Sequence, residues 1–454
     1  MRSLSLLVLA IVSLPYGFVQ AQATPEQLIG RSVSEPSNPR YEKVTAAMAR
    51  FFSGDVSGAR AQLNLAKKSN PELPPGGVML SKLYFSVNQQ ASARAELERA
   101  VVEDSNDPEA FLLFADVAWQ ERRYTEAETL YSRGNALCGE LKGNDFRKTN
   151  LLENAHAGLN SVAAAREQWD AAERHARDWL EVNASSAQAH SQLGRALFHR
   201  QQYQSALEEF KTAHKSNPQS PRPEINMALL YEELVAKGDA SKRASALKAM
   251  KQAAEADPQS FVTRLSIARW ALEACEIDMA ETNAKAAAEL DGESLDAKLI
   301  LGLVARHRKD YESAESAFRE IHNRAPANFE VVKQLSLSLI EQVDKKKQQL
   351  ALDYAELSFR ANKDLSQLAA REAAVTLAWV FYKLGRAPDA LGTVRSAVSA
   401  GSLSDESTYL AAKILSETGQ SNVAGQILEP ILRSSRCFPT RDDAEKLLSE
   451  LARK

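Results

Sequence analysis

The chain has 454 residues, of which 44% are hydrophobic and 25% charged, and its formal net charge at pH 7 is -3. This length exceeds what one compact core usually serves, so it favours several domains or one extended array. The near-neutral charge excludes the basic surplus of a nucleic-acid-binding chain and the acidic excess of a solvating tail. Helix-forming residues dominate, with only 19 Gly and 16 Pro, and they predict a mostly helical protein.

The first 23 residues have the pattern of an export signal. Arg2 supplies a positive start, and the apolar run LSLLVLAIVSL is too short to span a membrane comfortably. Small residues then occupy the cleavage positions in AQA, so we expect cleavage before Thr24. This predicts an exported chain, periplasmic or associated with the cell envelope, or secreted. An uncleaved membrane anchor is the alternative interpretation.

Residues 24–39 are rich in Pro, Ser and Asn, which predicts a flexible tether with little structure of its own. A different pattern begins at residue 40. It is clearest in the stretch AQAHSQLGRALFHRQQYQSALEEFKTAHKSNPQS, residues 187–220. If Ala187 is position 1, Leu-Gly stands at positions 7 and 8, Tyr at 17, Ala at 20, Phe at 24, Ala at 27 and Pro at 32. The same offsets recur from Leu295 and, more weakly, from Arg40.

This 34-residue pattern resembles the tetratricopeptide repeat (TPR). It predicts eleven repeats, at 40–73, 74–107, 108–141, 153–186, 187–220, 221–260, 261–294, 295–328, 329–365, 371–404 and 405–438. The repeats therefore fill 40–141, 153–365 and 371–438, separated by an insertion at 142–152 and a spacer at 366–370. Repeat six has six extra residues and repeat nine has three. Residues 439–454 are predicted to form a capping helix, with Thr440 as its N-cap.

The residue types at these positions have a physical meaning. Positions 1–14 and 17–30 are each one helix long, and small residues at positions 8 and 20 allow the two helices to cross closely. Proline at position 32 ends the second helix. One helix pair cannot bury its apolar face alone, but stacked pairs bury one another. The prediction is an all-α chain folded as a right-handed superhelical solenoid.

No motif in the sequence predicts catalysis, a cofactor or a metal site. The histidines form no zinc motif, although His156 and His190 share position 4 of successive repeats as an incomplete pair. Cys138, Cys275 and Cys437 are far apart and are interpreted as free or buried thiols, so the fold is expected to need no disulfide. The chain is therefore predicted not to be an enzyme.

The resemblance to TPR proteins implies a groove lined by positions 2, 5, 9, 12 and 13 of each first helix. The candidate partner-binding residues at these positions are Val44, Met48, Phe52, Val78, Lys82, Phe85, Leu112, Asp116, Trp119, Arg195, Arg269, Trp379 and Tyr382. Apolar side chains concentrate in repeats one to three. Either a partner segment or the residues 24–39 of this chain, folded back, are expected to cover them.

The predicted function is that of an exported, non-enzymatic scaffold that binds partner proteins or peptides in this groove. Nucleic acid is not an expected partner, and no membrane span is expected after signal cleavage. One alternative is a subunit of an envelope machine for polysaccharide export, secretion or outer-membrane assembly. The second alternative is an enzyme whose site carries no recognisable motif.

Overall fold

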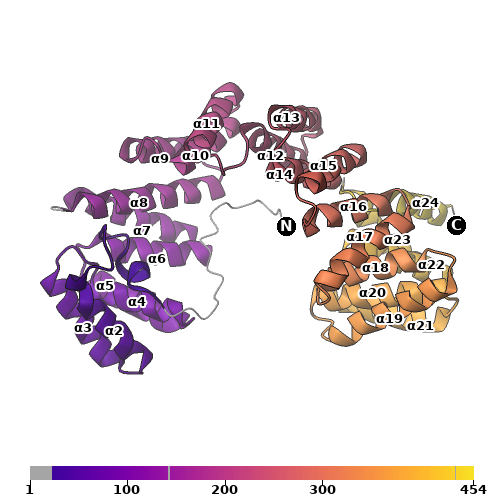
Figure 1. Cartoon of the computed structure of the whole chain (residues 1–454), viewed down its shortest axis with the longest axis horizontal. Helices are drawn as coiled ribbons and strands as arrows, with labels where there is room; N and C mark the ends of the chain where they lie inside the picture. The colour runs from indigo at the N-terminus through magenta and orange to yellow at the C-terminus, as the bar shows by residue number, and fades with distance from the viewer. Residues whose placement is uncertain (1–22, 142–143, 435, 454) are drawn as a thin grey trace. The chain divides into compact units, whose positions relative to one another are not determined.

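Helices make up all regular structure in the part of the chain that the computed structural model describes, which is residues 23–141, 144–434 and 436–453 (Figure 1). The predicted export signal at 1–23 lies outside the described residues, except for Ala23. Within the described ranges, no helix is long and apolar enough to cross a membrane. The predicted all-α class is confirmed.

The chain divides into two compact units, and the boundary lies inside α12 (Pro223–Ala236). The N-terminal unit ends at Leu230 and the C-terminal unit begins at Tyr231. Each repeat consists of a first and a second helix.

Besides α12, the first helices are α2 (Glu42–Phe52), α4 (Gly76–Ser86), α6 (Pro108–Gln120), α8 (Asp145–Ala165), α10 (Ala187–His199), α14 (Phe261–Glu273), α16 (Leu295–His307), α18 (Phe329–Ile340), α20 (Leu368–Lys383) and α22 (Asp405–Glu417). The second helices are α3 (Val56–Ser69), α5 (Gln90–Glu103), α7 (Tyr124–Glu140), α9 (Trp169–Val182), α11 (Tyr203–Ser216), α13 (Arg243–Ala256), α15 (Ile277–Leu290), α17 (Tyr311–Arg324), α19 (Lys345–Ala361), α21 (Ala387–Ala400) and α23 (Ser421–Leu432). Three short elements lie outside this pairing or within its turns: α1 (Pro25–Ile29), and the 3-10 helices at Pro39–Tyr41 and Ala240–Lys242.

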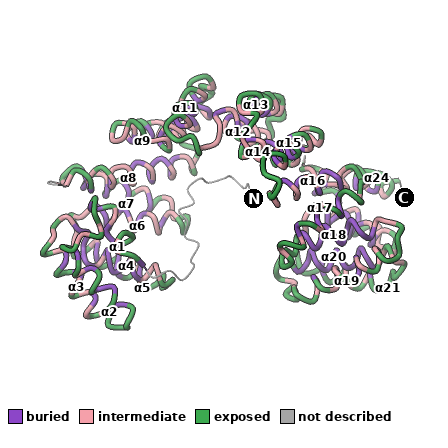
Figure 2. Tube along the Cα trace, viewed as in Figure 1, coloured by how far each residue is buried: buried purple, intermediate pink, exposed green. Residues whose placement is uncertain are grey.

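The helices stack in two layers within each unit. A first helix contacts the second helix of its own repeat, as α10 contacts α11, and first helices of successive repeats contact each other, as α6 contacts α8 and α18 contacts α20. We call the layer of first helices the first-helix layer. Buried residues alternate with partly or fully exposed ones along most of the helices, as the colours of Figure 2 show.

Small residues set how closely the helices of one repeat approach. Allowing for the extra residues of repeats six and nine, position 20 is an alanine with 0–1% exposure in all eleven repeats. These alanines are Ala59, Ala93, Ala127, Ala172, Ala206, Ala246, Ala280, Ala314, Ala351, Ala390 and Ala424. Position 8 is as crowded, because a methyl group added at Gly194 would come within 2.8 Å of the Phe210 ring. Position 8 is therefore glycine where the facing side chain is phenylalanine.

Enlarging position 20 is expected to force two helices apart. Ala206→Leu should destabilise the fold by roughly 1–3 kcal/mol, because no space surrounds Ala206 for three extra carbons. Ser205→Leu adds a similar bulk at an exposed neighbour on the same helix and is the matched control. Urea unfolding measures both variants, and an unchanged midpoint for Ala206→Leu would show that the helices are not in close contact there.

The turn between the two helices of a repeat has its own recurrent constraint. Position 15 has a positive φ in nine repeats, and Gly238 takes the equivalent place in repeat six. The residues are Gly54, Asn88, Arg122, Glu167, Gln201, Cys275, Lys309, Gly385 and Gly419. The next N–H then bonds back to the last turn of the first helix, as Gln202 N–H does to the Leu197 carbonyl at 2.9 Å. Because most of these residues are not glycine, the constraint cannot be read from the sequence.

Two predicted boundaries are wrong. Residues 145–152, assigned to the insertion 142–152, form the first two turns of α8, which the Asn144 side chain caps by accepting from the Arg147 N–H at 2.9 Å. The spacer 366–370 likewise contains the start of α20 at Leu368. In both places the 34-residue pattern is interrupted, but the first helix of the following repeat begins before the position at which the pattern resumes.

In the C-terminal unit, the first-helix layer is buried along most of α18, α20 and α22. Arg306 on α16 pairs with Glu406 on α22 at 2.8 Å, and both side chains are buried. Lys333 on α18 binds Glu372 on α20 at 2.9 Å, and Glu372 also accepts from the Ser407 hydroxyl at 2.5 Å. Since α16 and α22 belong to repeats eight and eleven, this layer curves tightly enough to close on itself.

A disulfide joins Cys275, in the turn after α14, to Cys437, between α23 and α24 (Arg441–Leu451). The expectation of free thiols at these two positions is therefore wrong, whereas Cys138 is a buried free cysteine. The two bonded residues are 162 positions apart, with Cα atoms 5.3 Å apart. Their proximity follows from the curvature of the unit, which sequence spacing does not reveal.

The helix α24 covers the end of the stack, as the sequence predicts. It contacts α22 and α23, and buries Ala444 and Leu447. Thr440 is the N-cap residue of α24, as predicted, but its hydroxyl makes no hydrogen bond to the helix. Lys309 instead binds Asp443 in the first turn at 2.8 Å.

Candidate peptide-binding surface

Residues 23–33, here called the N-terminal segment, fold back onto the first-helix layer of the N-terminal unit. The segment contains α1, which Thr24 and Gln27 close with a reciprocal capping box. Leu28 and Ile29 are 1% and 0% exposed, and they share one hydrophobic cluster with side chains of α2 and α4. The prediction of an unstructured tether over 24–39 is wrong for this part of it. Its few apolar side chains pack against apolar side chains of α2 and α4.

Three side chains bind main-chain carbonyls of the N-terminal segment. Lys82 Nζ on α4 donates to the Leu28 carbonyl at 2.8 Å. Asn144, which caps α8, donates to the Ser32 carbonyl at 2.9 Å, and Asn150 on α8 donates to the carbonyl of Arg31 at 3.4 Å. We call Lys82, Glu109, Asn144, Arg147 and Asn150 the receiving surface. Because every residue of a peptide carries a carbonyl, such contacts hold a backbone whatever its side chains.

Glu109, at the start of α6, is the centre of the receiving surface and is only 5% exposed. It accepts from Lys82 Nζ at 2.7 Å, from Arg147 Nη2 at 2.9 Å and from the Ser32 hydroxyl at 3.3 Å. Arg147 is buried as well and also binds Asp107 at 2.7 Å. Burial alone would raise the pKa of Glu109, but Lys82 and Arg147 outweigh it and lower the pKa to about 2.

This ionised carboxylate makes the stability of the N-terminal unit depend on pH. Its pKa in the folded chain is below the ordinary 4.5, so its contribution is present above about pH 4.5 and is lost as the pH falls toward 2. The corresponding decrease in the free energy of unfolding is on the order of 3 kcal/mol. Glu109→Gln should therefore unfold more easily than the parent at neutral pH, and the gap between them should narrow in acid.

Urea unfolding of both proteins from neutral pH down to about pH 3 measures that gap. Glu98→Gln is the matched control, because Glu98 on α5 pairs with Arg94 at the surface and is 54% exposed. A gap that stays constant with pH, or one equal to that of the control, would contradict the role of Glu109.

The candidate residues of repeats one to three lie in different environments. Val44 and Met48 are buried in the cluster that the N-terminal segment completes. Val78 and Leu112 are fully buried, but in clusters between helices. Phe52 remains exposed at 38%. The N-terminal segment therefore shares a cluster with Val44 and Met48, whereas Val78 and Leu112 pack in other clusters.

The other candidates in these repeats are partly exposed. Phe85 lies near the end of α4, and Trp119 stacks at an angle on Tyr124, with ring centres 5.3 Å apart. Asp116 accepts a hydrogen bond from the Tyr131 hydroxyl at 2.6 Å, and burial raises its pKa. These residues are not hydrogen-bonded to the segment.

The candidates farther along the chain do not belong to the receiving surface. The Arg195 guanidinium lies 5.9 Å from the centre of the Trp169 ring, and Arg269 pairs with Asp296 at 3.4 Å while remaining exposed. Those two arginines are in different units.

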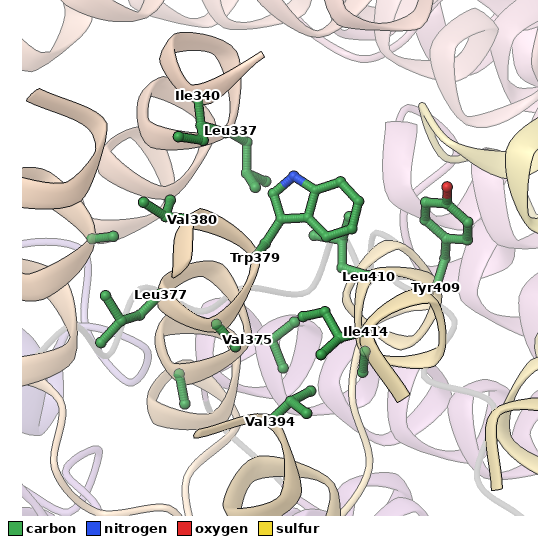
Figure 3. Packing of buried hydrophobic residues seen from close by; sticks show 14 of the residues in the cluster. Leu337, Ile340, Val375, Leu377, Trp379, Val380, Val394, Tyr409, Leu410 and Ile414 are labelled. Carbon is green, nitrogen blue, oxygen red and sulfur yellow. The ribbon is translucent and has the colours of Figure 1, made fainter. Parts of the chain in front are cut away.

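Trp379 and Tyr382 are in the C-terminal unit. Trp379 is buried among Leu337, Ile340, Tyr409 and Leu410 (Figure 3), and its indole N–H donates to Glu341 at 3.0 Å. The hydroxyl of Tyr382 donates to Glu417 at 2.5 Å. Trp379 is therefore part of the core.

Asn144, Arg147 and Asn150 were not predicted from the sequence as functional residues. All three lie in or beside the residues assigned to the insertion 142–152, which received no structural role. The interruption of the 34-residue period was the available signal. It marked the place where the first helix α8 is extended to 21 residues and supplies additional polar side chains.

Family models described as tetratricopeptide repeat match three stretches of the chain. One model matches residues 187–220, and a second matches residues 78–136 and 265–328. A comparison with curated proteins finds no match.

Three solved structures are similar to this chain, with low sequence identity and TM-scores of 0.38 or less. Yeast Tom70 shares 15% identity, with 91% of this chain and 95% of that chain covered and a TM-score of 0.38. YrrB, a TPR protein described as having an unusual peptide-binding site, shares 20% identity, with 44% and 95% covered and a TM-score of 0.33. Pseudomonas aeruginosa PilF shares 16%, with 49% and 93% covered and a TM-score of 0.32.

The paired helices in two layers define a protein built of helical repeats, and the family models identify those repeats. The chain contains tetratricopeptide repeats, which the models match over residues 78–136, 187–220 and 265–328. Repeats of this family serve as scaffolds for protein interaction and are typically not catalytic.

Proposed function

We propose that this chain is an exported scaffold that holds a peptide segment of a partner protein on the receiving surface. The N-terminal segment is the observation that carries the proposal. Its apolar side chains Leu28 and Ile29 are buried in the cluster with α2 and α4, and three of its carbonyls are bound by side chains of the receiving surface. A surface that holds one short peptide in this way has the chemistry to hold another of the same kind.

The bound segment also indicates the features of a suitable partner. Two adjacent apolar residues sit in one helical turn, and Lys82 binds the carbonyl of the first of them. Asn150 and Asn144 bind carbonyls of the stretch that follows. A hydroxyl, as on Ser32, meets Glu109. The partner should be a peptide with this pattern and without an acidic side chain at the place of Ser32, because Glu109 is already ionised there.

Covalent attachment gives the N-terminal segment an advantage over any partner. An attached segment competes at an effective concentration of roughly millimolar, so a free peptide binds only when the segment is displaced. The scaffold is therefore closed in the described state, and a partner must either bind tightly or arrive when the segment is released.

A labelled peptide with the sequence of residues 24–37 tests this proposal. Leu28→Ser with Ile29→Ser in the full chain should release the segment and allow the peptide to bind, while the parent binds little. Adding Lys82→Ala to the released variant should weaken binding roughly tenfold, the cost of one hydrogen bond from a charged donor.

Two controls make the result specific. Lys68→Ala removes an exposed lysine of α3 and should leave peptide binding unchanged. A peptide with both apolar residues replaced by serine should not bind. Fluorescence anisotropy measures all cases, and failure of the released variant to bind the parent peptide, with its helical circular dichroism intact, would contradict the proposal.

The proposed export has support in the C-terminal unit. Disulfides persist in oxidising compartments and are rare in the reducing cytosol, and the Cys275–Cys437 bond fits an exported chain. The apolar run of residues 1–23 supports the same proposal.

Thiol labelling of denatured protein taken directly from cells tests the export. The exported chain should react at Cys138 alone, whereas a variant lacking residues 2–23 should stay in the cytosol and react at all three cysteines. Cell fractionation followed by mass spectrometry measures both. Three reactive cysteines in the full chain, found in the cytosolic fraction, would contradict export.

A further inference from the structure

Repeat four brings together three metal-ligating side chains that the proposed scaffold function does not use. His156 lies on α8, and His175 and Asp178 lie one turn apart on α9. One potential ligand atom from each side chain lies within 4.8 Å of the other two. None of the three contributes to the receiving surface. The grouping depends on the packing of α8 against α9 and has no sequence motif.

Two of the three side chains have unsatisfied polar atoms. His156 is 8% exposed, and its Nδ1 is buried without a hydrogen-bond partner. His175 Nδ1 is likewise buried and unpartnered, and its 3.9 Å separation from Asp178 Oδ2 is too long for a hydrogen bond. Leaving a buried polar atom without a partner is unfavourable, and two such atoms in one place call for an explanation.

A metal ion bound by this cluster would give each imidazole a ligand bond. Two imidazoles and one carboxylate are donors that Zn²⁺ and related divalent transition metals accept. Tetrahedral coordination at normal Zn–N distances places donor atoms about 3.4 Å apart, so the three side chains need only converge slightly. The Asp178 side chain is 49% exposed, so it can adopt another rotamer, and water can supply a fourth ligand from the solvent side.

We propose that His156, His175 and Asp178 bind one divalent transition-metal ion, with Zn²⁺ as the preferred occupant. The bound ion links the two helices of repeat four and stabilises their pairing, because it binds the folded chain and not the unfolded one. His190, which shares position 4 with His156, is not part of this site. Its Nδ1 lies 2.6 Å from Glu209 and its Nε2 lies 3.2 Å from the Ala184 carbonyl.

Calorimetric titration of the full-length, tag-free and chelator-treated protein with ZnCl₂ tests the site. The parent should bind one Zn²⁺ per chain, and its thermal midpoint should rise with added metal. Asp178→Asn and His175→Ala should each lower the affinity by more than tenfold, since loss of even an outer-shell partner costs about 10–100-fold. Both positions are less buried than His156, so these variants are expected to fold.

His190→Ala is the matched control and should leave Zn²⁺ binding unchanged. Co²⁺ provides a second readout. Bound by three protein side chains in a four-coordinate site, Co²⁺ should absorb visible light, and Asp178→Asn should remove that absorption. No saturable binding by the parent would overturn the proposal. Binding that Asp178→Asn and His175→Ala leave unchanged would overturn it as well. Neither outcome bears on peptide binding at the receiving surface.

Discussion

The close approach of two helices at position 20 is the constraint on which the rest of the structure depends. A fully buried alanine stands there in every repeat, and at Ala206 and its counterparts any larger side chain would push the second helix away. The distance set inside one repeat also sets how the next repeat stacks, because each pair offers its neighbour the surface that remains. The curvature of each unit is therefore the sum of many small and nearly identical contacts.

The sequence predicted what is periodic and missed what is not. Small residues recur at positions 8 and 20, as Gly194 and Ala206 do in repeat five, so the helix pairs and their crossings could be predicted from residue types alone. The pairing of Arg306 with Glu406 joins residues 100 positions apart, from repeats eight and eleven. The Cys275–Cys437 bond was missed for the same reason. Such contacts depend on accumulated curvature, which no single repeat encodes.

The candidate site was predicted in part. Val44, Met48 and Lys82 were placed on the first-helix layer from repeat positions, and the fold-back of residues 24–39 was one of two expected occupants. The donors on α8 were missed because the repeat pattern has no position for Asn150. The tether was mistaken for a disordered segment because its composition conceals two well-placed apolar residues, Leu28 and Ile29. The average composition of a segment does not show which of its side chains pack against the rest of the chain.

The Cys275–Cys437 bond has a mechanical consequence. A stack of helical repeats behaves as a spring, since it lengthens by small rotations between neighbours and no helix has to unfold. A covalent link between repeat seven and the end of repeat eleven prevents that lengthening over the enclosed repeats, because their two ends cannot separate. If force is applied along the chain, the extension must come from the repeats that precede Cys275. The protein thus combines repeats that can extend under force with repeats whose extension the disulfide prevents.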